Sequence, residues 1–307
     1  MAVIPVKSAT NFSSSQAHCL IMRLLHLERH GRIPEQETRD VVSFFEECYD
    51  RLRPLSLDFV EIVLFENDRL WRTYMAAERR RAGVTSSDID DAFIAAHEAW
   101  TSIPRISISL DRRKTLAQPV WEGALRHEAG HSILHGSLEY YVFPMPKALL
   151  DVAHEFQALT AHLTDILYLL TVAVKDMEVT KLLVSNGYVE DQAAYARFVM
   201  KPTEQDQYAW ALSSITAVAR VLCLVGKMKD IAAATVLSSG SQGSRIGLEE
   251  IVECTKYLSR EAHTALLDTM SNILEVLDKD TFANVQSGSA ILATRLIEPI
   301  MRGSAPS

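Results

Sequence analysis

The stretch HEAGH, residues 127–131, combines the side-chain types that bind and use a metal ion. On a helix, residues four apart project from the same side, so His127 and His131 can place two imidazole nitrogens on one zinc ion. Glu128 follows His127 by one position, about 100° around the helix axis. It can therefore approach a water on the metal without taking a ligand position. The spacing predicts a site at which the ion and the glutamate together make a hydroxide-like nucleophile.

An HExxH string also arises by chance, and the competing interpretation is a helix whose histidines are only packed or solvated. The flanking residues favour the metal site. Pro119 suits the first turn of a helix and Gly136 its C-terminal stop, which predicts a helix from Pro119 to His135. Within it, Ala129 and Gly130 are small where a neighbouring element would have to pack closely behind the metal.

The other elements follow from hydrophobic periodicity and from helix-breaking residues. In RISISL, residues 105–110, apolar residues alternate with serines, which predicts an edge strand with one face outward. The remaining expected elements are helices at 16–30, 35–51, 68–81 and from 87 or 88 to 100, a strand at 57–67, a loop at 137–147, a long helical tract at 148–185, and a mainly helical remainder from Glu190 broken at Pro202, at 238–245 and near 287–289. A mixed half followed by an all-helical half predicts an α+β fold.

Composition excludes several classes of protein. The 307 residues are 48% hydrophobic and 23% charged, which is enough apolar material for a sizeable core. The formal net charge of −8 argues against a general nucleic-acid binder. We expect no membrane span, because no run of 18 apolar residues is free of charge. The first twenty residues lack the pattern of a secretory signal, and four widely spaced cysteines form no CxxC pair, so we expect a cytoplasmic protein.

On these residues the chain resembles the zincin metallopeptidases, over about residues 57–186. The resemblance implies a zincin-like fold, mostly helical, with a small β-sheet beside the active-site helix and a helical C-terminal half. It also implies that the edge strand, here residues 106–110, receives a peptide in extended form. Because Leu134 and Ser137 stand where metzincins have glycine and histidine, the third ligand must lie elsewhere.

In zincins of the gluzincin and aspzincin kinds, the third ligand is a Glu or Asp of the following helix. The candidates lie in LLTVAVKDMEVTKLL, residues 169–183. Asp176 shares a helix face with apolar residues, whereas Glu178 shares one with threonine and lysines. An acid on an apolar face needs a partner, so we favour Asp176 and keep Glu178 as the alternative. The run DMEVTKLL, residues 176–183, is also similar to a D-x-x-V-[NT]-x-x-L pattern of zincin-like proteins of uncharacterised, mainly archaeal families.

Other residues near the motif are weaker candidates. Tyr140 or Tyr141 could donate a hydrogen bond to a developing oxyanion, although aromatic packing in a loop is the simpler interpretation. His135 is interpreted as a helix-end histidine that interacts with free carbonyls, because three ligands at successive i+4 positions would diverge from one ion. Further possible ligands or groups that orient them are Asp151, His154, His162 and Asp165.

We expect three parts in the chain: a flexible tail at 1–15, which is rich in serine and asparagine, a zincin-like metallopeptidase domain at 16–200, and a helical region at 203–307 packed on it. We expect no nucleic-acid or membrane partner. A homo-oligomer is compatible with the sequence but is not indicated by it.

The expected function is zinc-dependent hydrolysis of a peptide or protein substrate. One zinc ion would be held by His127, His131 and Asp176, and Glu128 would activate the zinc-bound water. The alternative is a catalytically inactive or structural-metal zincin-like protein that works as an interaction or regulatory module.

Overall fold

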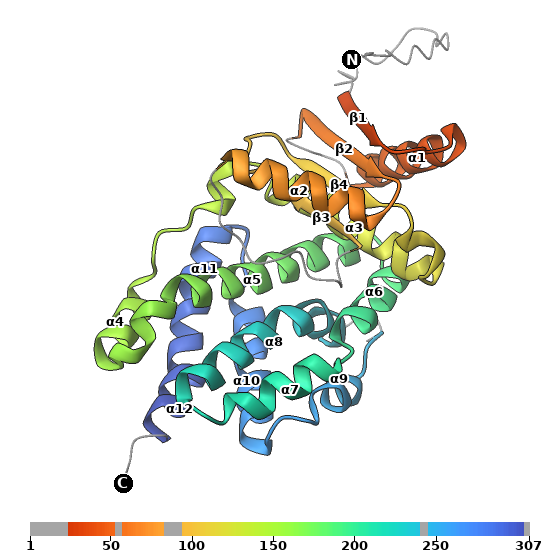
Figure 1. Ribbon diagram of the computed structural model, residues 1–307. Helices are drawn as coiled ribbons and strands as arrows, with labels where there is room; N and C mark the ends of the chain where they lie inside the picture. Colours follow the sequence, from red (N-terminus) through yellow and green to blue (C-terminus); the bar gives the residue numbers. More distant parts are fainter. Residues whose placement is uncertain (1–23, 53–56, 83–93, 240–244, 304–307) are drawn as a thin grey trace, which may run out of the picture.

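The computed structural model describes residues 24–52, 57–82, 94–239 and 245–303. In these ranges the chain is mostly helical and contains one four-stranded sheet, so the expected α+β class is confirmed. The sheet and its helices lie at one end of the molecule, and the helices of the C-terminal half lie at the other (Figure 1). The tail expected at residues 1–15 falls outside the described residues.

The sheet is mixed, with the strand order β1-β2-β4-β3. Its strands are β1 (Leu24–His30), β2 (Phe59–Phe65), β3 (Ala95–Glu98) and β4 (Arg105–Ser109). Strands β1, β2 and β4 run parallel to one another. Strand β3 is antiparallel to β4, and its Ala95 pairs with Ile108. β3 is therefore the edge strand on the side of the sheet away from β1.

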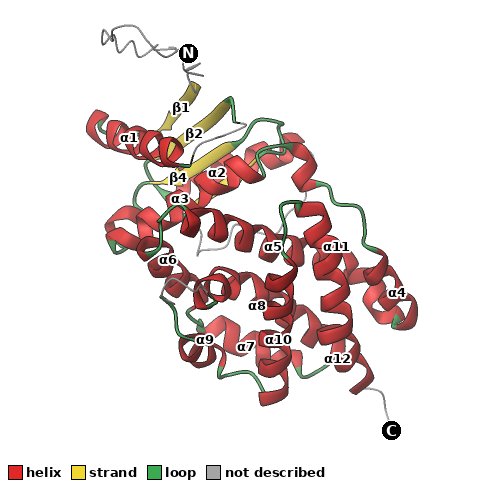
Figure 2. Cartoon of the chain, turned by 180° about the vertical axis from the view of Figure 1, so that it is seen from behind, coloured by secondary structure: helices red, strands yellow, loops and turns green. Residues whose placement is uncertain are grey.

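Helices cover both faces of the sheet because the strand residues alternate between the faces. On one face, Ile62 of β2 joins a core with α1 (Glu35–Arg51) and α3 (Gln118–Leu134). On the other face, Val63 and Phe65 pack against Trp71 and Met75 of α2 (Asp68–Ala82). Figure 2 shows the sheet with α1 and α3 from behind.

Helix α5 (Leu163–Ser185) connects the sheet-side core to the core of the helical half. Its Val179 and Leu183 belong to the core below the sheet, and its Leu170 and Val174 belong to the larger helical core. The other helices are α4 (Lys147–Glu155), α6 (Glu190–Met200), α7 (Glu204–Ser213), α8 (Ala217–Ser238), α9 (Leu248–Thr255), α10 (Arg260–Val276), α11 (Thr281–Leu292) and α12 (Glu298–Gly303). The larger core runs across residue 200, and the division into domains at 16–200 and 203–307 stays a prediction.

One helical stretch in the described ranges, Gln157–Ser185, is long and apolar enough to cross a membrane by length and composition. Most of it is α5, which packs on α3, α8 and α11 at the centre of the fold. A helix that is apolar on most sides is also what the interior of a helical protein requires.

The prediction that residues 105–110 form an edge strand is wrong. β4 is interior, between β2 and β3, and its Ser107 and Ser109 are fully buried instead of facing solvent. Their hydroxyls have polar partners, Met75 Sδ at 3.9 Å and Asp111 Oδ1 at 2.6 Å respectively. Alternation along a strand shows that its two faces differ, but it does not show which strands flank it.

Two expected helices are strands where the structure describes them. Within 16–30, Leu24–His30 is β1, and within 87–100, Ala95–Glu98 is β3. In β1, Leu25 and Leu27 pack on the sheet-side core, which is the period-2 pattern of a strand. Pairing of β1 with the distant β2, and of β3 with the adjacent β4, outweighs the local helical spacing.

The expected tract at 148–185 is also corrected, because it breaks at Phe156, whose backbone has φ −118° and ψ 79°, and is resumed by a 3₁₀ turn and α5. The break expected near residues 287–289 does not occur, because α11 runs without interruption through them. The helices expected at 35–51, 68–81 and 119–135 and the strand expected at 57–67 are confirmed.

Candidate metal centre

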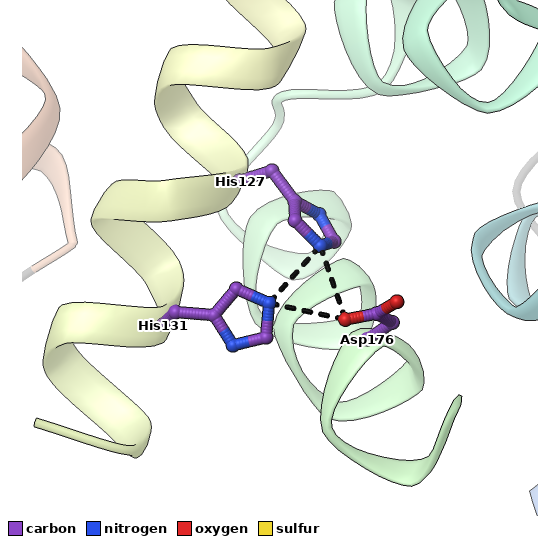
Figure 3. A group of neighbouring side chains, drawn as sticks. All are labelled: His127, His131 and Asp176. Carbon is purple, nitrogen blue, oxygen red and sulfur yellow. Dashed lines mark hydrogen bonds and ion pairs between the residues drawn. The ribbon is translucent and has the colours of Figure 1, made fainter. Parts of the chain in front are cut away.

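Two helices bring three possible ligands together. His127 and His131 project from the same side of α3, and Asp176 of α5 points at both of them (Figure 3). His131 Nε2 lies 3.2 Å from His127 Nε2 and 3.1 Å from Asp176 Oδ1. The third side of the triangle, from His127 Nε2 to Asp176 Oδ1, is 3.5 Å. This group could hold a metal ion.

The triangle has the dimensions of a tetrahedral site. Bonds of about 2.0–2.2 Å from one zinc ion to nitrogen and oxygen place neighbouring ligand atoms about 3.3 Å apart. All three separations lie within a few tenths of an ångström of that value. Three protein ligands also leave a fourth position open, which is the arrangement of catalytic zinc sites.

Close packing of α3 on α5 positions the acid. A Cβ built on Gly130 would lie 2.6 Å from Cγ1 of Val179, so only glycine allows this approach. Gly130 is next to His131 in the sequence, and Val179 is three residues after Asp176. The small residue at position 130 therefore lets α3 and α5 approach closely enough for Asp176 to reach the two histidines.

Charge and burial both act on the three side chains. Burial alone would raise the pKa of Asp176, but its hydrogen bonds to the two imidazoles hold that pKa well below its usual range. Burial lowers the pKa of His131 to about 3, so its ring is neutral. Burial would also lower the pKa of His127, but the hydrogen bond and charge of Asp176, together with the charge of Glu128, raise it. A divalent ion requires neutral imidazoles, so it would have to displace the proton of His127.

Glu128 lies beside the triangle but is bound elsewhere. Its side chain is buried, and its Oε2 accepts the backbone N–H of His97 on β3 at 2.8 Å. Burial raises the pKa of Glu128 to about 7, and the nearby charges of His127 and Asp176 also act on it. The carboxylate is therefore poised to exchange a proton near neutral pH.

Glu178, the alternative third ligand, points away from the triangle. Its Oε2 accepts a hydrogen bond from Nε2 of His135 at 2.8 Å. His135 is fully buried at the end of α3, and it contacts His131 and Glu178 instead of the free helix-end carbonyls that were expected. Of the two acids considered, only Asp176 is within reach of both His127 and His131.

The two candidate tyrosines occupy different places. The hydroxyl of Tyr141 lies 3.2 Å from Nδ1 and 3.4 Å from the carbonyl oxygen of His97. The ring of Tyr140 packs against His135 and Phe282, as expected of aromatic packing. Of the further candidates, Asp151, His154 and Asp165 are exposed, and His162 pairs with Asp165.

Sequence reasoning missed two aromatic neighbours of the site. The ring of His97 stacks on His131 with 6.0 Å between centroids, and the ring of Tyr195 lies 5.3 Å from that of His127. Burial, with the charges of Glu128 and Asp176, raises the pKa of Tyr195 well above its usual value, so its O–H remains a donor. Gly123 was a usable signal, since a Cβ there would lie 2.8 Å from Cβ of Tyr195 and so marks where α6 approaches α3.

No protein-family model, curated protein or solved structure matches this chain. The chemistry assigned to the protein therefore depends on the geometry of the site itself.

Proposed function

We propose that this chain is a zinc-dependent peptidase of the zincin kind, in which His127, His131 and Asp176 hold one ion and Glu128 is the general base. One observation carries the proposal: one atom each of His127, His131 and Asp176 lie 3.1–3.5 Å from one another, spaced for a tetrahedral ion, with Glu128 next to His127 in the same helix. Imidazole and carboxylate ligands suit zinc and leave a position for chemistry.

A zinc ion in this position would polarise the carbonyl of the substrate and lower the pKa of a water molecule. Glu128 would accept a proton from the attacking water as its oxygen bonds to the peptide carbon. The same carboxyl would pass that proton to the amine nitrogen as the C–N bond breaks. Tyr195 would donate its O–H to the carbonyl oxygen as negative charge develops there.

The edge strand β3 is the surface along which an extended peptide would lie in this proposal. It borders α3, so a peptide paired with it would pass the metal site. At His97, however, the backbone N–H and C=O are already engaged by Glu128 and Tyr141. A peptide must therefore displace these two contacts or pair on either side of His97.

The contacts of Glu128 and Tyr141 with the backbone of His97 favour a second candidate function. In this candidate, a zincin-like protein holds a metal without hydrolysing peptides and serves as an interaction module. The residues His127 and Glu128 are almost completely enclosed, at 4% and 7% exposure. In this candidate, Glu128 is a structural acceptor for the edge strand.

The two candidates differ in what Glu128→Gln does. We would measure bound metal by mass spectrometry, and cleavage of casein and of a quenched fluorescent peptide library, for the full chain and this variant. The peptidase proposal expects about one zinc per chain in both proteins and a loss of about 10²–10⁴-fold in rate for Glu128→Gln. The matched control is Glu139→Gln, which changes an exposed acid beyond the end of α3. Bound zinc with no cleavage that depends on Glu128 would support the interaction module.

A further inference from the structure

The metal-ligand candidate His131 is the first member of a row of hydrogen-bonded side chains that extends into the C-terminal half. His131 Nδ1 lies 3.1 Å from Nδ1 of His135, and Nε2 of His135 lies 2.8 Å from Oε2 of Glu178. Glu178 is in turn bound to Thr281 and Asn284 of α11. Nothing in the proposed hydrolysis uses His135, Glu178 or α11.

The direction of these hydrogen bonds follows from the outer end of the row. The Asn284 amide is fixed by Asp278, whose N–H donates to Asn284 Oδ1 and whose carbonyl accepts from Asn284 Nδ2, each at 2.8 Å. Nδ2 of Asn284 therefore also donates to Glu178 Oε1, at 2.5 Å. The hydroxyl of Thr281 donates to Glu178 Oε2 at 2.8 Å. Both carboxylate oxygens are thus acceptors.

Since Glu178 only accepts, the proton of His135 must be on Nε2. A neutral imidazole carries one proton, so Nδ1 of His135 is then an acceptor. The facing Nδ1 of His131 must donate to it, which directs the lone pair of Nε2 at the position that an ion would occupy. Without an ion, the Asp176 carboxylate at 3.1 Å competes for a proton on this nitrogen. That nitrogen is the one that faces His127 and Asp176.

We propose that Glu178 and His135 are positioning residues that hold His131 in the tautomer with its proton on Nδ1, so that its Nε2 is available to a metal ion. The proposal deepens the metal site and rests on the proposed function only for the identity of what Nε2 binds. A hydrogen bond to the distal nitrogen both orients a ligand imidazole and fixes its tautomer. Here the bond passes through a second histidine before it reaches the carboxylate.

The arrangement gives the C-terminal half a part in the site. Thr281 and Asn284 stand in the first turn of α11, about a hundred positions beyond Glu178 in the chain. They supply two of the three hydrogen bonds that Glu178 receives and so keep its oxygens aimed at His135. Ligand orientation in α3 then depends on the docking of α11 against α5.

The first test needs no substitution in the row. Nitrogen-15 spectra of the histidine rings, recorded on the metal-free full-length chain, distinguish the two tautomers directly. We expect protonated Nδ1 in His131 and protonated Nε2 in His135. A proton on Nδ1 of His135 would overturn the proposal whether or not the protein binds zinc, because this nitrogen could then not accept from Nδ1 of His131.

The second test compares zinc affinity, measured by competition with a chromophoric chelator, among variants of the row. Glu178→Met removes the acceptor with little change of shape and should weaken zinc binding by about 10- to 100-fold. Glu178→Gln, which keeps an oxygen acceptor, should recover part of that loss. Thr281→Val should have a smaller effect in the same direction. The absorption spectrum of bound cobalt should change with Glu178→Met, because the orientation of His131 changes.

The matched control is Val285→Ala, which creates a cavity in the buried face of α11 without removing a hydrogen bond of the row. If Glu178→Met is destabilised like this control but binds zinc as tightly as the wild type, the role is only structural and the proposal fails. If the wild type binds no zinc at all, the proposed function fails, and the nitrogen-15 spectra still decide the tautomers.

Discussion

Gly130 of α3 lies directly against Val179 of α5, so closely that a Cβ at position 130 would be 2.6 Å from Cγ1 of Val179. This contact occurs next to His131 in one helix and one turn from Asp176 in the other. The separation of the two helices, and with it the distance between the two ligands, is therefore set by the absence of a single methyl group.

Gly130→Ala should destabilise the protein although alanine is the better helix former. Relief of the clash requires a shift of α3 or α5, and overpacking of this kind costs about 1–3 kcal/mol. We expect a lower free energy of unfolding in urea and weaker zinc binding. Adding Val179→Ala, which makes room for the new methyl group, should restore part of both.

The matched control is Gly226→Ala in α8, where an added Cβ would meet nothing within 4 Å. There the change should stabilise the protein by up to about 1 kcal/mol through helix propensity. A stabilised Gly130→Ala would show that the two helices can separate freely.

Removal of metal should lower the stability of the wild type. An ion that binds only the folded state stabilises it by about 4 kcal/mol when its free concentration is 1,000 times its dissociation constant. Thermal unfolding with and without a zinc chelator measures the difference. Asp176→Asn should lose most of the zinc-dependent increase in Tm, whereas Asp165→Asn, at an exposed site of the same helix, should keep it. Equal increases in both variants would exclude Asp176 as a ligand.

Glu128→Ala and Glu128→Gln should differ in stability although both remove the charge. The alanine variant leaves the N–H of His97 without its 2.8 Å acceptor, and a buried donor without a partner costs about 1–3 kcal/mol. Glutamine keeps an oxygen that can accept this hydrogen bond. Unfolding in urea, together with hydrogen exchange at the His97 amide, measures both effects. Equal exchange rates in the two variants would mean that Glu128 does not hold β3.

Tyr195→Phe should reduce peptide hydrolysis and leave zinc affinity unchanged. Its ring is packed 5.3 Å from that of His127, and its phenol stays protonated because burial raises its pKa. The loss of one donor to a developing oxyanion lowers kcat by about 10²–10³-fold. Tyr208→Phe, which changes an exposed tyrosine of α7, is the control. An unchanged kcat in Tyr195→Phe would assign this tyrosine to packing.

The ion pair between Arg197 and Glu250 should make a small contribution to stability that disappears in acid. Hydrogen bonds from Arg197 and from the Gly247 N–H lower the pKa of Glu250 to about 2, against about 4.3 for an unfolded chain. Because the pKa of Glu250 is lower in the folded state than in the unfolded chain, its charged form stabilises the folded state. This contribution is complete above about pH 4.3 and is lost as the pH falls toward 2. Because the pair is exposed, we expect at most about 1 kcal/mol.

The measurement is the difference in unfolding free energy between the wild type and Glu250→Gln. This difference should shrink as the pH is lowered from 6 to 3. A difference that grows over this range would contradict the assigned direction of the pKa shift.

Several features were predictable from local sequence alone because they depend on neighbours within one helical turn. The helix 119–135 and the shared face of His127 and His131 follow from the 3.6-residue period and from Pro119 and Gly136. The preference for Asp176 over Glu178 came from the face of the helix on which each acid lies. The structure brings Asp176 to both histidines.

Other features depend on contacts between separate elements, which the spacing of residues within one element does not encode. β1 and β3 are strands because β2 and β4 pair with them, although local apolar spacing favoured helices. The strand order in the sheet likewise decides which strand lies at the edge. It also places His97 of β3 next to Glu128.

The row from His131 through His135 and Glu178 to α11 shows the same division. Local periodicity places His135 one turn after His131, so the sequence determines that the two rings are neighbours. Only the packing of α5 against α3, and of α11 against α5, brings Glu178 and then Thr281 and Asn284 to them. A helix determines which side chains share a face, but hydrogen bonds between helices exist only once the apolar faces have been buried together.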